Sequence, residues 1–114
     1  MADFDIDYRR EPQGTIARLR GHAANREAER LRSRLADLLA EKPGPVVLDL
    51  TELRFIASAG LAELIDFRRR LQDDGADLRL AGANAQVESI FLKTHLAELF
   101  PMFPDAESAL AGRR

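Results

Sequence analysis

The chain of 114 residues carries a formal net charge of −2 and contains no cysteine. The charge lacks the basic excess that nucleic-acid binding usually requires, and the missing cysteines exclude a disulfide framework and thiolate chemistry. With 46% apolar and 32% charged residues, the composition is typical of a globular protein, and we expect one domain over residues 1–114.

The N-terminal residues predict a β-hairpin. Residues 3–8 alternate aspartate with Phe, Ile and Tyr, and this period of two indicates a half-buried strand. Pro12 and Gly14 punctuate the following turn. Residues 15–20 return as a second strand, which we expect Gly21 to end.

A first helix is expected from Asn25, as its N-cap, to about Ala40. Its apolar residues share one face, and its arginines are left on the outside. We interpret these arginines as a solvated helix surface and not as a binding patch. Residues 42–45, Lys-Pro-Gly-Pro, stop the helix.

The central stretch places a serine at the start of a second helix. Val46–Leu50 is a short apolar run that predicts a buried strand. Ser58 precedes small residues and a helical pattern over Leu61–Leu71, which suggests an N-cap. A hydroxyl there lies beside unpaired N–H groups and the positive end of the helix dipole, which would also hold a phosphate. The stretch by itself leaves two interpretations open: a simple cap, or a modified serine that a partner reaches.

The C-terminal part alternates strand and helix once more. Residues 73–75 stop the second helix, and 76–81 predict a strand. Asn84 is a plausible N-cap for a third helix. The segment 99–104 is expected to be extended because two prolines restrict it, and Asp105 caps a last short helix.

Strands separated by helices predict an α/β fold, with a mixed and mostly parallel sheet and right-handed crossovers. The periodicity of these elements also predicts the core. We expect it to be built from Ile16, Leu19, Leu31, Leu35, Leu38, Val47, Leu48, Leu50, Leu64, Ile65, Leu78, Leu80, Ile90 and Phe91.

Catalysis would require constellations that the sequence lacks. His22 and His95 lie in separate regions, and no phosphate loop, metal-ligand cluster or cysteine nucleophile is present. We therefore expect a binding protein that is not an enzyme and needs no metal or cofactor. No apolar run approaches the roughly 18–20 residues that cross a bilayer, and the acidic N-terminus is unlike a signal peptide. A cytoplasmic protein without membrane insertion is expected.

The segment 55–61, Phe-Ile-Ala-Ser-Ala-Gly-Leu, preceded by Val-Val-Leu-Asp-Leu, resembles the motif of STAS domains. These domains are bacterial anti-sigma factor antagonists and their relatives. The usual form is Asp-Ser-Ser-Gly-Leu or Asp-Ser-Ala-Gly-Leu, and its first serine, the phosphoacceptor, falls on Ser58. The tail from Leu78 to Phe103 is also similar to the end of these domains. The resemblance covers nearly the whole chain and implies a single STAS domain.

Two positions depart from the family pattern. Ala57 stands where kinase substrates usually carry an acidic residue, and Ala24 replaces the aspartate of Gly-Glu-Leu-Asp. In the family both aspartates lie near the surface presented to the partner, so the departures imply either an unusual partner or a lapsed phosphorylation. The partner-binding residues implied by the resemblance are Ala24, Asn25, Ala57, Ser58, Ala59, Gly60 and Leu61.

The resemblance implies a role in partner switching. The unphosphorylated domain would dock an anti-sigma factor that is a serine kinase of the histidine-kinase-like ATPase type, and phosphorylation of Ser58 would end the complex. The alternative is a phosphorylation-independent docking subunit of a signalling complex or of a transport complex of the lipid ABC type. Small residues would let a partner backbone approach closely. We therefore expect Gly60→Leu to abolish binding while the melting temperature stays nearly native.

Overall fold

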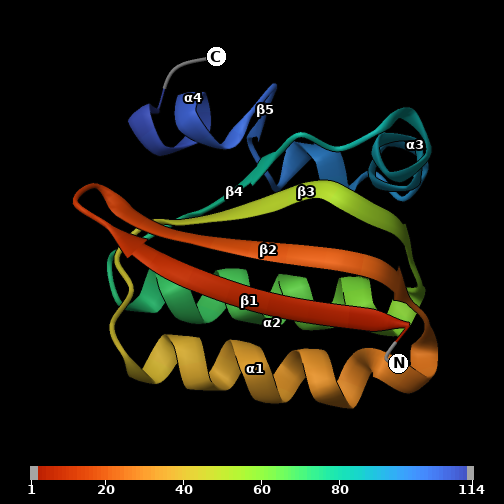
Figure 1. Cartoon of the computed structure of the whole chain (residues 1–114), viewed down its shortest axis with the longest axis horizontal. Helices are drawn as coiled ribbons and strands as arrows, with labels where there is room; N and C mark the ends of the chain where they lie inside the picture. The colour runs from red at the N-terminus through yellow and green to blue at the C-terminus, as the bar shows by residue number, and fades with distance from the viewer. Residues whose placement is uncertain (1–2, 113–114) are drawn as a thin grey trace.

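The N-terminal hairpin forms one edge of the sheet (Figure 1). The computed structural model describes residues 3–112. Strand β1 (Phe4–Glu11) runs antiparallel to β2 (Gly14–Ala23), as predicted. β2 does not end at Gly21. This glycine has φ +89°, and a Cβ on it would lie 2.1 Å from the Asp3 carbonyl oxygen, so it admits a close backbone approach within the strand.

The sheet then continues in chain order, β1-β2-β3-β4-β5. Strands β3 (Val46–Ile56), β4 (Leu78–Ala81) and β5 (Met102–Phe103) each run parallel to the strand before them. The expected mixed, mostly parallel sheet is confirmed. β3 extends six residues beyond the predicted Leu50, through two irregularities in its pairing with β2. Its length carries the chain directly to Ser58.

Helices cover both faces of the sheet (Figure 1). On one face lie α1 (Ala28–Ala40) and α2 (Ser58–Asp73), and on the other lie α3 (Ala85–Lys93) and α4 (Ala106–Ala111). Two short 3-10 helices, η1 (Asn25–Glu27) and η2 (Leu96–Glu98), precede α1 and follow α3. The segment expected as the start of the first helix is therefore the separate turn η1.

The predicted core is confirmed except at two positions on helices. The prediction is wrong for Ile65, whose side chain is 37% exposed. Ile90 is only half-buried against the core. The pattern did not anticipate Phe100, which is buried against the predicted core residue Phe91 of α3. Phe91 and Phe100 meet edge to face with ring centroids 5.8 Å apart. The other twelve predicted residues are buried: Ile16, Leu19, Leu31, Leu35, Leu38, Val47, Leu48, Leu50, Leu64, Leu78, Leu80 and Phe91.

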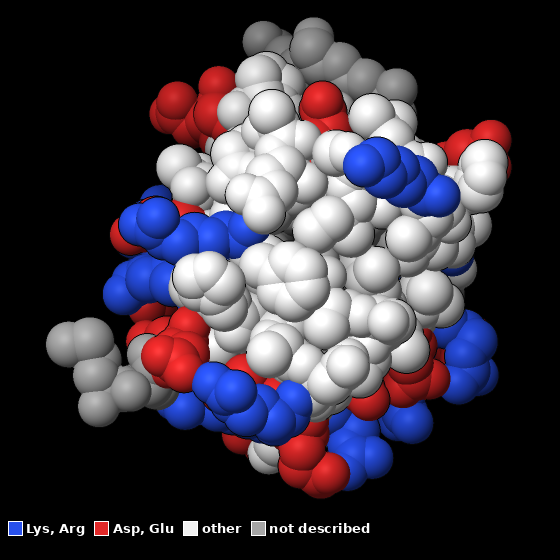
Figure 2. Space-filling view, turned by 90° about the vertical axis from the view of Figure 1, so that its right-hand side faces the viewer, with Lys and Arg blue, Asp and Glu red and all other residues white. Residues whose placement is uncertain are grey.

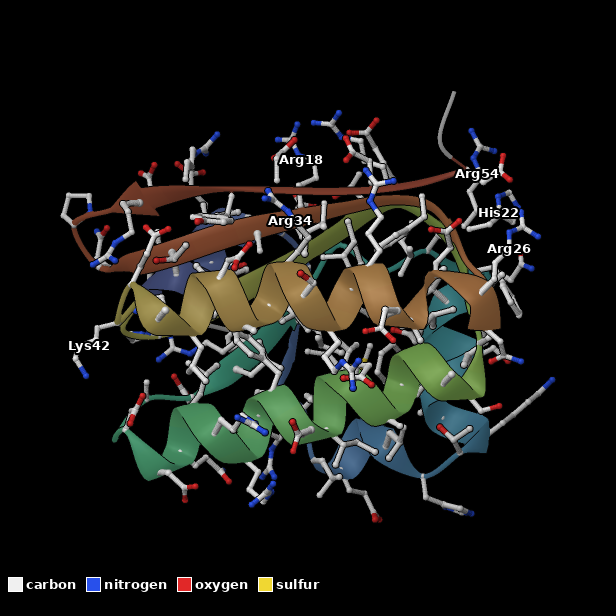
Figure 3. The ribbon with its side chains drawn as sticks, turned by 90° about the horizontal axis from the view of Figure 1, so that it is seen from below. Arg18, His22, Arg26, Arg34, Lys42 and Arg54 are labelled. Atoms are coloured by element: carbon white, nitrogen blue, oxygen red, sulfur yellow. The ribbon has the colours of Figure 1, made fainter. Side chains whose placement is uncertain are left out.

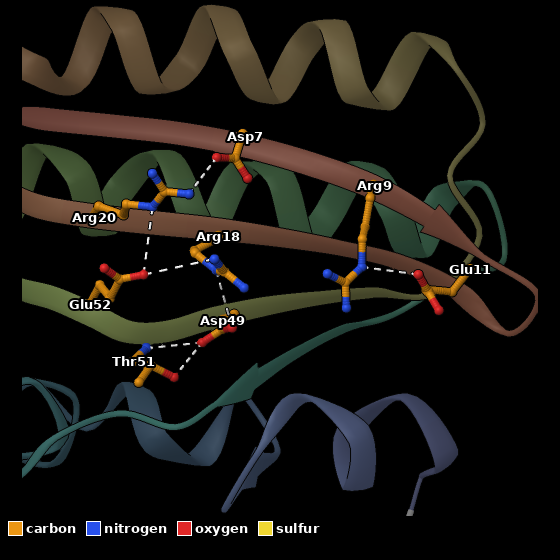
Figure 4. Close-up of polar contacts among 8 residues, drawn as sticks. All are labelled: Asp7, Arg9, Glu11, Arg18, Arg20, Asp49, Thr51 and Glu52. Atoms are coloured by element: carbon orange, nitrogen blue, oxygen red, sulfur yellow. Dashed lines mark hydrogen bonds and ion pairs between the residues drawn. The ribbon is translucent and has the colours of Figure 1, made fainter.

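A chain of ion pairs crosses the outer face of β1, β2 and β3 (Figure 4). Arg18 contacts Asp49 at 3.6 Å and Glu52 at 3.8 Å. Arg20 contacts Glu52 at 3.7 Å and Asp7 at 2.8 Å. Most of these groups are well exposed, so each pair contributes little to stability. Together they make this face strongly polar.

The caps of α3 and α4 are those that the sequence predicted. The Asn84 side-chain oxygen accepts a hydrogen bond from the Val87 N–H at 2.9 Å, and its amide nitrogen donates to the Leu53 carbonyl at 3.0 Å. Asp105 accepts from the Ser108 N–H at 2.8 Å. Asn84 thus ties the start of α3 to β3.

We predict that Asn84→Ala lowers the free energy of unfolding by about 1 kcal/mol, because an N-cap is lost. Denaturant unfolding measures the change. Asn84→Asp, which keeps the accepting oxygen, should lose less. Equal stability of Asn84→Ala and the unchanged chain would contradict this role.

Candidate functional site

Ser58 is the first residue of α2 and is exposed to solvent. The predicted N-cap role is wrong: the cap position is Ala57, with φ −84° and ψ 169°. The reason is that the Ala57 N–H still donates to the Ala23 carbonyl at 2.8 Å, which keeps the chain extended for one residue more. The Ser58 hydroxyl makes no hydrogen bond to any other residue in the range 3–112. It is therefore free to react or to meet a partner.

The first turn of α2 is capped from another part of the chain. The Asn25 side-chain oxygen accepts a hydrogen bond from the Ala59 N–H at 3.2 Å. The sequence predicts Asn25 as the N-cap of the helix that follows it. In the structure, however, Glu27 occupies the cap position of α1, and no side chain caps that helix. The contact joins two predicted partner-binding residues that are 34 positions apart.

The structure brings all seven predicted site residues to one end of the sheet, at different depths. Ser58 and Asn25 are exposed, while Ala24, Ala57 and Ala59 are half-buried. Gly60 and Leu61 are buried. The surface that a partner can contact is therefore smaller than the predicted set.

Gly60 is buried and faces Ile56 at the end of β3. A Cβ placed on it would lie 2.9 Å from Ile56 Cγ1 and 3.2 Å from Ile56 Cδ1. This packing argues against the expectation that Gly60→Leu leaves the melting temperature nearly native, and predicts a loss of stability instead. The glycine lets the first turn of α2 pack directly onto the end of β3.

The chain segment on both sides of Ser58 is uncharged. Residues 55–62 contain no charged side chain. Figure 2 looks onto the end of the molecule where α1 and α2 begin, and its centre is occupied by uncharged residues with charged ones around the rim. Further along α2, Asp66 accepts hydrogen bonds from Arg69 and Arg70, both at 2.8 Å, and these lower the pKa of its carboxyl. The first charged residue of α2 is thus Glu63, and Asp66 with its two arginine partners lies about two turns after Ser58.

Phe55 is an exposed aromatic residue that the sequence analysis did not single out as a site residue. It is 37% exposed and pairs with His22 across β2 and β3. Figure 3 shows Arg54, His22 and Arg26 together at this end of the sheet. Arg26 is paired with Asp3 at 2.6 Å, whereas Arg54 forms no ion pair with the part of the chain that is described. The break in alternation around Arg54 and Phe55 was the only sequence signal for their exposure.

Residues 3–112 offer neither a cluster of metal ligands nor a helix that could span a membrane. No group of three or more His, Asp or Glu side chains there could hold a metal ion. Among the same residues, no helix combines the length and the apolar character needed to cross a membrane.

Comparison with protein families and curated proteins gives a consistent picture. The STAS domain family matches residues 5–109. BtrV of Bordetella bronchiseptica, which is named as an anti-sigma factor antagonist, is 31% identical over 96 residues, which cover 84% of this chain and 83% of BtrV. Rv2638 of Mycobacterium tuberculosis, named as an anti-anti-sigma factor, is 34% identical over 68 residues. That match covers 60% of this chain but only 46% of the mycobacterial protein.

Solved structures confirm the fold. An anti-sigma factor antagonist from Mycobacterium paratuberculosis superposes with a TM-score of 0.86 at 19% identity, covering 96% of this chain and 92% of that chain. The anti-sigma factor antagonist SpoIIAA in its unphosphorylated form has a TM-score of 0.80 at 17% identity, covering 93% of each chain. At these identities the likeness concerns the arrangement of strands and helices.

We predict that Gly60→Leu destabilises the chain by about 1–3 kcal/mol, because its side chain must displace Ile56. Thermal or denaturant unfolding measures the loss. The matched control is Ala62→Leu, which adds a leucine at an exposed position of the same helix and should change stability by no more than about 0.5 kcal/mol. If both variants unfold alike, Gly60 does not have this packing role.

Proposed function

The chain belongs to the STAS domain family, and from that premise we propose that it is an anti-sigma factor antagonist whose switch is phosphorylation at Ser58. The observation that carries the proposal is the exposed Ser58 hydroxyl, which lies at the start of a 16-residue helix in a segment, residues 55–62, that has no charged side chain. The names of the curated relatives support the antagonist role. We propose a partner of the anti-sigma factor class that is also a serine kinase.

In the unphosphorylated state, the uncharged surface around Ser58 docks the partner. Ala57 and Ala59 have short side chains that let a partner backbone approach closely, and Phe55 offers an exposed aromatic ring beside them. Aromatic residues often contribute much of the binding energy in protein interfaces. Occupation of this surface would hold the anti-sigma factor and so release the sigma factor.

Phosphorylation ends the complex by changing the charge at the centre of the contact. The γ-phosphoryl group of ATP passes to Ser58 Oγ, the hydroxyl proton leaves, and ADP is released. The added group carries about −1.5 to −2 charges at neutral pH. Burying it against an apolar partner surface is costly, whereas in the free chain the helix N-terminus favours an anion. Phosphate therefore stabilises the dissociated state.

The alanines at positions 57 and 24 determine where the base for phosphoryl transfer to Ser58 must come from. Neither supplies a carboxylate beside Ser58, so the base that accepts the hydroxyl proton would come from the kinase. SpoIIAA, a protein of this fold, is known in both an unphosphorylated and a phosphorylated form. This supports the fold as one that accommodates a phosphoryl group.

The test is the intact mass of the chain after incubation with ATP and a histidine-kinase-like ATPase, which is first sought among the products of neighbouring genes. We predict that the chain gains one phosphate, that Ser58→Ala gains none, and that the modified chain no longer binds the kinase. Ser58→Asp is a poor substitute for the phosphorylated chain, because it carries less charge and fewer accepting oxygens.

One outcome would favour the alternative function. A chain that binds the kinase tightly but gains no phosphate would be a phosphorylation-independent docking module. The alanines at positions 24 and 57 are the observation in favour of this second function, because they remove the acidic neighbours that the family pattern places there.

A further inference from the structure

The segment before α1 and the first turn of α2 are joined by two hydrogen bonds. The Ala57 N–H donates to the Ala23 carbonyl at 2.8 Å, which extends the pairing of β2 with β3 by one bond. The Ala59 N–H donates to the Asn25 side chain at 3.2 Å. The first bond is made by backbone alone, whereas the second depends on one side chain.

The Ala59 N–H has no acceptor closer in sequence. Ala57, at the cap position, has no side-chain oxygen, and the Ser58 side chain does not cap the helix. In α3 the arrangement is the ordinary one, since Asn84 caps the helix that directly follows it. Asn25 therefore caps α2, which is distant from it in sequence, whereas Asn84 caps α3, which directly follows it.

We infer that Asn25 is a positioning residue, which holds the turn η1 against α2 and is released when Ser58 carries a phosphate. The role of phosphate in this inference rests on the proposed function. A phosphate on Ser58 is attached one residue before the Ala59 N–H and offers charged oxygens to it. Hydrogen bonds to ionised acceptors are roughly twice as strong as those between neutral groups, so the phosphate displaces the neutral Asn25 oxygen.

Release of Asn25 changes the surface that a partner meets. Ala24 and Asn25 precede α1, whereas Ala57, Ser58 and Ala59 open α2, and the side-chain bond between Asn25 and Ala59 aligns the two groups. When that bond breaks, η1 loses its side-chain link to the first turn of α2 and is held by its own chain neighbours, by the end of β2 and by the ion pair between Arg26 and Asp3. Phosphorylation then acts twice: it places charge on the first turn of α2 and releases Ala24 and Asn25 from their side-chain bond to that turn.

The test installs phosphoserine at position 58 during biosynthesis, so that no kinase is needed. Hydrogen exchange is then measured by mass spectrometry and NMR on the modified and unmodified chains. Amides of residues 25–28 should exchange at least about tenfold faster in the phosphoserine chain, because their contact with α2 is lost. Amides of α3 should be unchanged.

Two variants separate positioning from general stability. Asn25→Ala should show fast exchange at residues 25–28 without phosphate, and phosphoserine should add nothing further. Asn84→Ala, the matched control, should raise exchange in α3 and leave the phosphoserine response at residues 25–28 intact. Asn25→Asp keeps an accepting oxygen and should restore slow exchange in the unmodified chain.

Two results would overturn the inference: equal exchange of residues 25–28 with and without phosphate, or a phosphate response that persists in Asn25→Ala. Neither depends on a kinase. Failure of the neighbouring ATPase to phosphorylate Ser58 would count against the proposed function, while the exchange comparison would still decide the role of Asn25.

Discussion

The parallel pairing of β2 with β3 is the constraint on which the rest of the structure depends. It runs from Thr15 opposite Val46 to Ala23 opposite Ile56, and the Ala57 N–H adds one more bond. Because both strands are held up to their last residues, the segments that follow them leave the sheet side by side. One of these segments enters α2 at once, and the other forms the turn before α1. The proximity of two stretches far apart in the sequence follows from this pairing.

The small residues around Ser58 serve two different needs. Gly60 allows the helix to pack onto Ile56, which is a requirement of the core. The alanines on either side of Ser58 are half-buried and leave the hydroxyl accessible. A motif that reads as one uniform run of small residues thus divides, within a single helical turn, into an inner side that fixes the helix and an outer side that a partner can approach.

The order of strands and helices could be predicted from the sequence because each element repeats its apolar residues with its own period. Failures occurred where several segments compete for one position. Ile65 has helical spacing suited to the core, yet Leu64 and Phe67 fill that side of α2 and leave Ile65 outside. The bond from Ala59 to Asn25 depends on the register of two strands, which local patterns do not contain. The candidate site residues could be named from the motif, but their burial could not be predicted from it.

The aspartates of β1 have a consequence beyond their local ion pairs. β1 is the first strand of the sheet, so one side of it has no neighbouring strand within the described residues. Free strand edges can recruit a strand from another molecule and begin aggregation, and charged side chains oppose this. Asp5, Asp7 and Arg9 are all exposed along β1. These exposed charges therefore oppose edge-to-edge pairing of β1 with a strand of another copy of this chain.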